Sequence, residues 1–318
     1  MNSNTPQKSA VSILEVSTAQ LNQRLDNFLI KHLGNVPRTR IYRIIRKGEV
    51  RVNKKRSKPD YKLQIGDQVR IPPMHLDQER PRKARPPERL QAKIKRAILY
   101  ENSDILVVDK PAGLAVHAGS GVDYGLIDVM RQLYPQTGIE LVHRLDRDTS
   151  GCLMLAKNRA ALLGMQMLLR DHLLNKNYIA VVQGNWPSNL REISQPLKKY
   201  HLSNGERRVR IDSDGKPALS RVRLLRGGKL FSLIQVELVT GRTHQIRVHC
   251  QSQGHAIAGD DKYGDNEFNR NMRRRGIRRL MLHASSLELP ICAYTSEVVI
   301  NAPLPAEFEH LLGGQKRA

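Results

Sequence analysis

The sequence has few cysteines and few aromatic residues for its length. Its 318 residues include three cysteines, Cys152, Cys250 and Cys292. An odd number of widely spaced cysteines predicts neither a disulfide framework nor a paired-cysteine metal site. Aromatic residues make up only 4% of the chain, whereas broad platforms that stack single-stranded nucleic acid need more of them. Such a stacking platform is therefore not expected in this protein.

Long hydrophobic runs and nucleotide-binding motifs are also missing. No apolar run approaches the roughly 18 residues that a membrane helix needs, and residues 1–10 lack the apolar core of a signal peptide. We therefore expect a soluble, cytoplasmic protein with no membrane partner. There is no Walker A loop, and Gly119-Ser120-Gly121 is not followed by the third glycine of a dinucleotide site. The sequence thus gives no support for a nucleotide cofactor.

Acidic residues are scarce relative to basic ones. The chain has 53 Lys and Arg against 30 Asp and Glu, a net charge of +23 and a pI near 10.3. Such an excess favours a polyanionic partner, because neutralising phosphates releases counterions. The excess is concentrated early in the chain: residues 24–96 hold 22 Lys and Arg and 7 Asp and Glu. The front of the protein is therefore predicted to be a basic binding module.

The length and the changes in composition predict two domains, one of them small. The expected divisions are a mobile polar tail at 1–18, a basic domain at 19–75, a proline-containing linker at 76–96 and a catalytic domain at 97–318. In the catalytic domain, short strand-like segments are interspersed with few helices. This pattern favours an α+β fold, with a mixed, largely antiparallel sheet and flanking helices and loops, over a regular βαβ repeat.

The basic domain shows two helical patterns followed by short strands. Apolar residues at helical spacing predict a helix over 21–33, and Ile41, Ile44 and Ile45 form the apolar stripe of a second helix that begins at Pro37. Strand signals follow at 50–53 and 69–71. The residues expected to contact RNA are basic side chains on the second helix and the following hairpin: Arg38, Arg40, Arg43, Lys47, Arg51, Lys54 and Lys55. The segment over about 20–75 resembles the S4 RNA-binding domain, which is a small unit that docks on structured RNA.

Residues 143–151 carry the strongest chemical signal. The stretch His-Arg-Leu-Asp-Arg-Asp-Thr-Ser-Gly places Asp146 and Asp148 among two arginines. Nearby cations favour the charged form of a carboxylate, which can then act as a nucleophile or a base. The alternative is a solvated turn in which Asp146 only pairs with Arg144. Asp148 is interpreted as structural, at the turn before Thr149 and Ser150.

Residues 240–254 are polar and rich in histidine. The alternation of Gln245, Arg247 and His249 is compatible with a strand, but Ile246, Cys250 and Gly254 favour a short helix that ends near the glycine. His244 and His249 lie five positions apart, a spacing that suits neither ligation from one helix face nor a known zinc pattern. A metal-dependent ribonuclease that uses His244, His249 and Asp260 is nevertheless an alternative hypothesis.

Several separate segments together resemble the RluA family of pseudouridine synthases. They are residues 109–113, 143–146, 176–178, 241–247, 259–264 and 282–284. The resemblance implies an enzyme that isomerises specific uridines of 23S ribosomal RNA to pseudouridine, without a cofactor or a metal. The implied partner is ribosomal RNA, free or in a pre-50S particle, and we expect a monomer. A non-catalytic RNA-binding or ribosome-assembly protein with the same fold is the alternative.

The resemblance also implies roles for individual residues. Asp146 is the catalytic residue, acting by nucleophilic attack or by proton chemistry at the ribose. Arg247, 101 positions away, is its partner cation, although a phosphate contact is the alternative. Tyr178 packs against the target uracil and assists proton transfer, whereas by itself it would be read as a core residue.

Four more residues are assigned by the same resemblance to RNA contact and base flipping. Arg144 fills the space that an extruded nucleotide leaves, which offsets part of the cost of unstacking. Lys110 shapes the floor of the site together with Pro111, unless it is only a surface charge. Arg242 and His244 complete the group.

Overall fold

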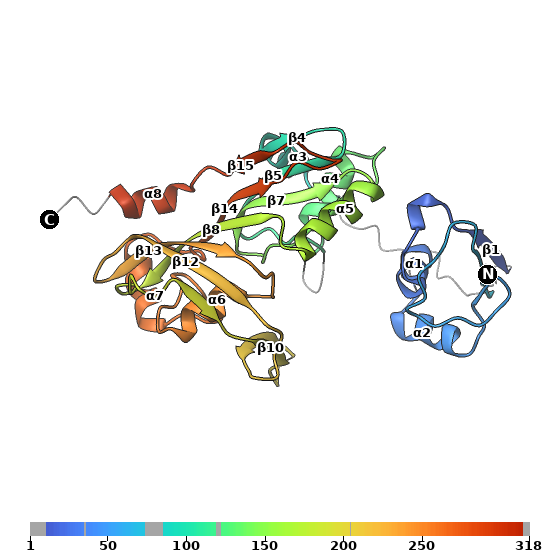
Figure 1. Cartoon of the computed structure of the whole chain (residues 1–318), viewed down its shortest axis with the longest axis horizontal. Helices are drawn as coiled ribbons and strands as arrows, with labels where there is room; N and C mark the ends of the chain where they lie inside the picture. Colours follow the sequence, from blue (N-terminus) through green and yellow to red (C-terminus); the bar gives the residue numbers. More distant parts are fainter. Residues whose placement is uncertain (1–10, 35, 74–84, 119–121, 204, 314–318) are drawn as a thin grey trace, which may run out of the picture. The chain divides into compact units, whose positions relative to one another are not determined.

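The structure, a computed structural model, describes residues 11–34, 36–73, 85–118, 122–203 and 205–313. The chain divides into two compact units, Met1–Lys83 and Ala84–Ala318. Figure 1 labels many of the elements of both units. Each unit has a hydrophobic core of its own, and each is therefore described separately.

The described part of the first unit contains two α-helices and a small sheet. Helix α1 spans Leu25–His32 and α2 spans Arg38–Arg46. Strands β1 (Ser12–Glu15), β2 (Arg51–Val52) and β3 (Gln68–Ile71) form an antiparallel sheet in the order β1-β3-β2. A short 3-10 turn, η1 (Thr18–Gln20), follows β1. The two predicted helices and the two strand signals therefore all correspond to elements.

The spacing of apolar residues explains why α2 docks as it does. Ile41, Ile44 and Ile45 are buried on one face, while Arg43 and Arg46 remain exposed on the other. The predicted mobile tail at 1–18 is wrong for its second half, because Ser12–Glu15 pairs with β3 through backbone hydrogen bonds. Residues 1–10 of that prediction lie outside the described residues.

The second unit is built on a large, mixed sheet. Its strand order is β4-β5-β7-β14-β8-β13-β12-β9, with β15 paired to β14 and β6 to β7. The pairing of β7 with β14 is parallel and the other described pairings of this sheet are antiparallel. The strands are β4 (Ile98–Glu101), β5 (Ile105–Lys110), β6 (Glu140–Leu141), β7 (Ser150–Ala156), β8 (Asn175–Gln183), β9 (Glu192–Ser194), β12 (Leu219–Arg226), β13 (Phe231–Leu238), β14 (Leu282–Leu289) and β15 (Val298–Asn301). The expected α+β fold with a largely antiparallel sheet is confirmed.

Within its described residues, a separate hairpin and six helices complete this unit. Strands β10 (Leu197–His201) and β11 (Arg207–Ile211) pair only with each other among the described strands, and Figure 1 shows the hairpin extending below the large sheet. The helices are α3 (Glu88–Arg96), α4 (Leu126–Leu133), α5 (Arg159–Arg170), α6 (Gln245–Ser252), α7 (Asn266–Arg274) and α8 (Ala306–Gly313). Every residue of β7 is buried, which agrees with the predicted strand covered on both faces.

Helix α3 corrects the predicted linker. The sequence placed residues 76–96 between the domains, but Glu88–Arg96 is helical and Ile94 is fully buried in the core of the second unit. Prolines at 86 and 87 precede the helix, and Pro87 is its N-cap residue, a position next to the helix start where proline is well tolerated. The composition suggested a linker because α3 is mostly polar and charged, with Ile94 as its buried residue. Residues 76–84 of the prediction lie outside the described residues.

The start of β7 fixes the loop that carries the catalytic candidate. Gly151 has a φ of +106°, and a Cβ there would clash with the backbone of Ala284 on the neighbouring parallel strand. Glycine is therefore required for β7 and β14 to approach each other at this point. This close approach holds residues 143–149 at the end of two central strands.

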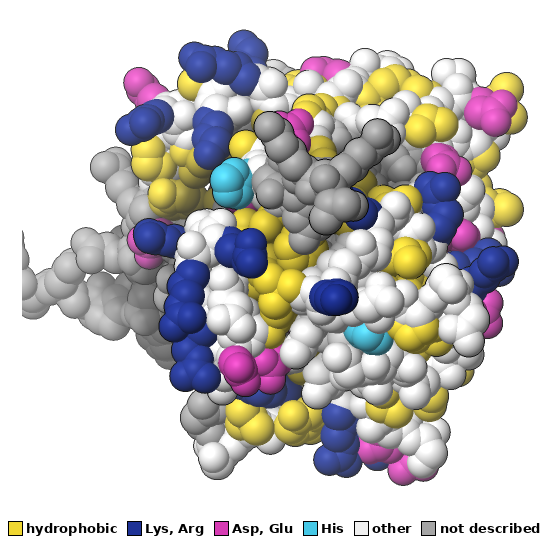
Figure 2. All heavy atoms as spheres, turned by 90° about the vertical axis from the view of Figure 1, so that its left-hand side faces the viewer, with side chains coloured by type: hydrophobic (Ala, Val, Ile, Leu, Met, Phe, Trp, Pro, Cys, Tyr) yellow, Lys and Arg dark blue, Asp and Glu magenta, His cyan; other side chains and the backbone are white. Residues whose placement is uncertain are grey.

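The surface on the α8 side of the molecule has a mixed character. Figure 2 shows dark-blue Lys and Arg side chains dispersed around yellow apolar ones, and not gathered in one patch. Within the described ranges, no helix is long and apolar enough to cross a membrane.

Candidate active site

Asp146 and Arg247 meet at the centre of the second unit. Asp146 belongs to the loop before β7, and Arg247 lies on the first turn of α6. The Nη1 of Arg247 donates to Oδ2 of Asp146 over 3.1 Å. The side chain of Asp146 is 19% exposed and that of Arg247 is 6% exposed. The carboxylate is thus paired with a buried cation and still reachable from solvent.

A second carboxylate, Asp260, fixes the orientation of Arg247. Its two oxygens accept hydrogen bonds from Nε and Nη2 of Arg247, at 2.7 and 2.8 Å. Oδ1 of Asp260 also accepts from the backbone amides of Lys262 and Tyr263. Because this bidentate contact uses one edge of the guanidinium, Nη1 is left to face Asp146.

The charges of this cluster stabilise each other. Burial disfavours the charged form of Arg247, but its hydrogen bonds to Asp260 and the charges of Asp260 and Asp146 outweigh burial and raise its pKa. Burial would likewise raise the pKa of Asp260, but the hydrogen bonds and charge of Arg247 lower it. Arg247 and Asp260 are therefore both ionised at neutral pH.

His244 connects the cluster to the β10–β11 hairpin through Tyr263. It is the N-cap residue of α6 and has a left-handed backbone, with a φ of 53°. Its Nδ1 lies 2.7 Å from the hydroxyl of Tyr263, which accepts a hydrogen bond from the backbone amide of Val209 on β11. The ring of Tyr263 also packs against the guanidinium of Arg247 at 5.1 Å. Tyr263 therefore touches His244, Arg247 and the hairpin together.

The environment of His244 favours a neutral imidazole. Burial lowers the pKa of His244, although the charge of Asp146 opposes that shift. The Tyr263 hydroxyl accepts from Val209, so its proton is available to Nδ1 of His244. We assign the ring proton to Nε2 on this basis, which lies 3.9 Å from Oδ1 of Asp146.

Tyr178 lies on β8 and faces the same pocket. Burial and the negative charge of Asp146 raise the pKa of Tyr178, so its hydroxyl keeps its proton at neutral pH. A protonated phenol beside a carboxylate can donate or relay a proton. Tyr178 is well buried and also lines the pocket. It can therefore be a core residue and a residue of the site at the same time.

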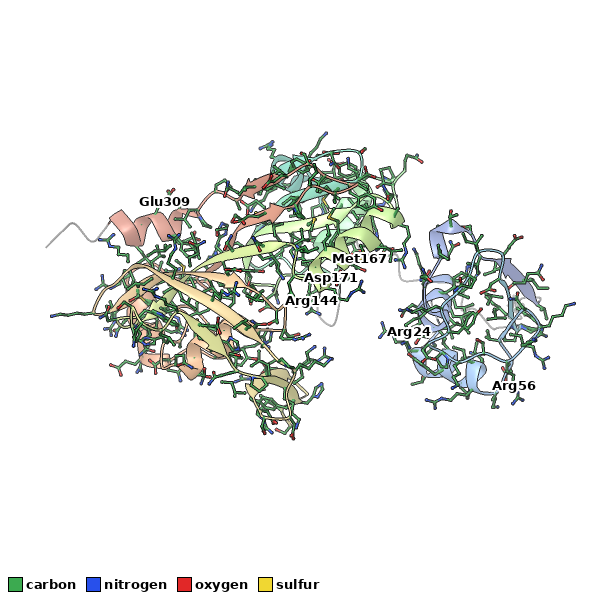
Figure 3. All side chains as sticks on the ribbon, in the orientation of Figure 1. Arg24, Arg56, Arg144, Met167, Asp171 and Glu309 are labelled. Atoms are coloured by element: carbon green, nitrogen blue, oxygen red, sulfur yellow. The ribbon has the colours of Figure 1, made fainter. Side chains whose placement is uncertain are left out.

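One pocket collects most of the predicted site residues. Six of the seven predicted for catalysis or base flipping line it: Arg144, Asp146, Tyr178, Arg242, His244 and Arg247. Arg144 is exposed, and Figure 3 labels it on the second unit, near the loop between β6 and β7. Arg242 is also exposed, and its Nε donates to the carbonyl of Pro217. Three distant segments of the chain thus meet at one opening.

Lys110 is the exception, because it does not line this pocket. It is fully buried, and its ammonium donates to the carbonyl oxygens of Pro111, Leu114 and Arg147, each at 2.9 Å. Burial lowers the pKa of Lys110 to about 7, opposed by the charges of Asp148 and Asp146. Lys110 thus holds the backbone of the Asp146 loop at Arg147, and its burial excludes the alternative that it is only a surface charge.

The geometry gives no support to the metal-dependent ribonuclease. Both ring nitrogens of His249 are in hydrogen bonds, to Ser220 and to the carbonyl of Gln195, and Asp260 is held by Arg247. Across the described ranges, no group of three His, Cys, Asp or Glu side chains is arranged to hold a metal. The three proposed ligands therefore do not form one site.

The basic residues predicted in the first unit lie at its surface. Arg40 is half-buried, and the others are exposed on α2 and the turn after β2: Arg38, Arg43, Lys47, Arg51, Lys54 and Lys55. Arg51 donates weakly to the carbonyls of Gly48 and Lys54. Figure 3 labels Arg24 and Arg56 in the same unit. Arg24 pairs with the buried Asp26, which is a structural role.

Sequence reasoning missed two residues of the site. Asp260 was considered only as a metal ligand, and Tyr263 received no role. Their signal is the segment Gly259–Gly264, which precedes α7 and in which a buried acid and an aromatic residue lie three positions apart. Nothing in that segment alone indicates that it supports an arginine on α6.

Comparisons with known proteins agree with this arrangement. Residues 104–252 match the model of the RNA pseudouridylate synthase family, and residues 23–69 match the S4 domain. The chain is 45% identical to ribosomal large subunit pseudouridine synthase C of Pasteurella multocida, over 96% of this chain and 94% of that protein. It is also 45% identical to the protein of that name from Escherichia coli, over 96% and 95% of the two chains.

A solved structure shows the same fold at lower similarity. It is titled Human RNA Pseudouridylate Synthase Domain Containing 4, with a TM-score of 0.58 and 26% identity over 70% of this chain and 94% of that one. The pocket around Asp146, the basic first unit and these matches point to one conclusion. The chain belongs to the RluA family of RNA pseudouridine synthases and carries an N-terminal S4 domain.

Proposed function

We propose that this enzyme isomerises specific uridines of 23S ribosomal RNA to pseudouridine, with Asp146 as the catalytic residue. The observation that carries the proposal is the pairing of Asp146 with Arg247 at the wall of an open pocket. The printed names of the relatives, which refer to the ribosomal large subunit, support the choice of RNA. The substrate is the free RNA or a pre-50S particle, in the cytoplasm, and the enzyme acts as a monomer.

The reaction rearranges bonds within one nucleotide. The bond from C1′ to N1 breaks, the uracil turns, and C1′ bonds to C5. The proton of C5 leaves and N1 gains one, so the atoms balance without an oxidant, a reductant or an energy source. No cofactor is needed for such a rearrangement, and the protein must supply only a charged group at the sugar and a route for the proton.

The site residues suit these two tasks. Asp146 faces the ribose and acts as nucleophile or as base, while Arg247 forms an ion pair with it at the pocket wall. Tyr178 lies beside it with a protonated hydroxyl, next to the uracil. Arg144 is exposed at the rim, where its planar guanidinium can occupy the gap in the RNA stack after the uridine is flipped out.

The S4 domain anchors the RNA. Its exposed arginines and lysines on α2 and the following turn contact phosphates, which set affinity and position more than sequence choice. Selection of the uridine then falls to the pocket and the loops around it.

The experiment that tests this function is a map of pseudouridines in 23S ribosomal RNA. Cells without the gene are compared with the same cells that carry it on a plasmid. The expected result is that defined pseudouridines disappear in the first strain and return in the second. An unchanged map, with the purified protein still binding the RNA, would support the non-catalytic RNA-binding alternative.

A further inference from the structure

Lys176 is a largely buried lysine near the pocket. Its charge forms no ion pair with Asp146 or Asp260. It is the second residue of β8, with 8% of its surface exposed. Side chains two positions apart on a strand share a face, so Lys176 points to the same side of the sheet as Tyr178. Within the described part of the chain, its ammonium has no carboxylate partner and no hydrogen bond.

The ammonium lies between two segments of the active site. A Cβ placed on Gly241, which lines the pocket, would stand 3.7 Å from Nζ of Lys176. The charge of Lys176 also contributes to the lowered pKa of His143, a residue three positions before Asp146 in the same loop. The ammonium therefore lies behind Gly241, an exposed glycine that lines the pocket.

Burying most of a lysine side chain is costly when its ammonium has no ionic partner. Burial lowers the pKa of Lys176, and an anion that reaches it would remove the penalty and favour the charged form. Asp146 has its own partner in Arg247, so an anion of a bound RNA would not compete with it for Lys176. Gly241 has no side chain to block the way.

We propose that Lys176 binds a phosphate group of the RNA strand next to the target uridine, and that Gly241 is the opening through which the phosphate approaches. The inference rests on the proposed function, because a flipped uridine in the pocket brings its flanking phosphates to the pocket edge. Phosphates are the charged groups of RNA, and a lysine binds them as a compact point charge. The residue would thus position the nucleotide, while Asp146 and Tyr178 carry the chemistry.

The test is a double-mutant cycle that combines a substitution of Lys176 with the neutralisation of single phosphates in the RNA. Single-turnover conversion is measured for the parent and Lys176→Met on a short RNA with one target uridine. Each phosphate flanking the uridine is replaced in turn by an uncharged methylphosphonate. For the parent, one replacement is expected to raise the half-saturating enzyme concentration about tenfold, as for loss of a charged hydrogen bond, with little change in the maximal rate.

For Lys176→Met, the half-saturating enzyme concentration should already be about tenfold higher with unmodified RNA. Replacing the same phosphate should then raise it no further. Lys95→Met, which removes an exposed lysine from α3, is the matched control and should behave as the parent. Equal sensitivity of the parent and Lys176→Met to every flanking replacement would overturn the proposal. The same assay measures conversion of unmodified RNA by the parent. If the parent converts no RNA, the proposed function fails, and this result differs from equal sensitivity of the two proteins.

A second variant keeps the lysine and closes the opening. Gly241→Ala places a methyl group in ordinary contact with Nζ, so the fold should tolerate it. It is expected to raise the half-saturating concentration for normal RNA and to make the critical phosphate unimportant. Parent-like binding by Gly241→Ala, with full sensitivity to that phosphate, would contradict the proposed path even if Lys176→Met fails to fold.

Discussion

The guanidinium of Arg247 lies 3.1 Å from the carboxylate of Asp146, although 101 positions separate the two residues. Arg247 reaches this position because Asp260 holds its other edge at 2.7 and 2.8 Å. Asp260 is itself fixed by two backbone amides. The position of the predicted catalytic carboxylate therefore depends on a buried ion pair that has no chemical task of its own.

Loss of Arg247 should destabilise the fold as well as the site. In Arg247→Met, the carboxylate of Asp260, whose side chain is 1% exposed, loses its partner. We expect the free energy of unfolding to fall by about 3–5 kcal/mol, as for other broken buried pairs. Urea denaturation measures the change. Arg242→Met removes an exposed arginine from the same segment and should leave stability unchanged; equal stability of the two variants would contradict the account of Asp260.

Tyr178→Phe separates the ring of Tyr178 from its hydroxyl. The ring still fills its buried place on β8, so we expect stability and RNA affinity close to those of the parent. The rate of conversion should fall by about 100-fold or more, the usual effect of losing a group that transfers protons. Single-turnover kinetics at saturating enzyme give this rate. A rate equal to that of the parent would show that Tyr178 acts through its ring alone.

Buried His283 should make stability depend on pH in a defined window. Burial lowers the pKa of His283 to about 4, compared with about 6.5 in an unfolded chain. Between these values the unfolded state binds more protons, so the free energy of unfolding should rise with pH, by at most about 1.4 kcal/mol per unit from this group. Above the window the contribution is constant.

The check is urea denaturation of the parent and His283→Gln at several pH values across that window. The variant should show a shallower rise of stability with pH. His310→Gln, on the exposed surface of α8, should follow the parent. Parallel pH curves for the parent and His283→Gln would mean that His283 does not stay neutral in the fold.

RNA binding by the S4 domain should depend strongly on salt. Arg43→Ala and Lys47→Ala each remove an exposed charge on or beside α2. Each should reduce the slope of log affinity against log salt by about 1, because one phosphate contact is lost. Arg274→Ala on α7, an exposed arginine of the second unit, serves as the control. Unchanged slopes for both α2 variants would place the RNA elsewhere.

Local patterns predicted the elements that depend on neighbouring residues. Helix α2 was predicted from the apolar spacing of Ile41, Ile44 and Ile45. The short helix α6 was predicted from Ile246, Cys250 and Gly254. The uninterrupted apolar run at 152–156 gave a strand buried on both faces. In each case the signal lies within one element or directly beside it.

Features that depend on distant partners were harder to predict. Strand β1 has no strong pattern and forms because β3 offers its edge. Helix α3 forms because Ile94 is buried in the core of the second unit. The charges and prolines around Ile94 are typical of a linker, so the local sequence did not predict the helix. The pairing of Asp146 with Arg247 was expected only from family resemblance, and the support from Asp260 and Tyr263 was not expected, because it arises where α6 and the loop before α7 meet.

The most direct measurement of the central claim is conversion of a 23S ribosomal RNA fragment by Asp146→Asn. The substitution keeps the shape of the side chain and removes its charge, so RNA affinity should persist while pseudouridine formation falls by at least about 100-fold. Asp148→Asn, two positions away and exposed, should convert RNA as the parent does. Full conversion by Asp146→Asn would contradict the assignment of Asp146 as the catalytic residue.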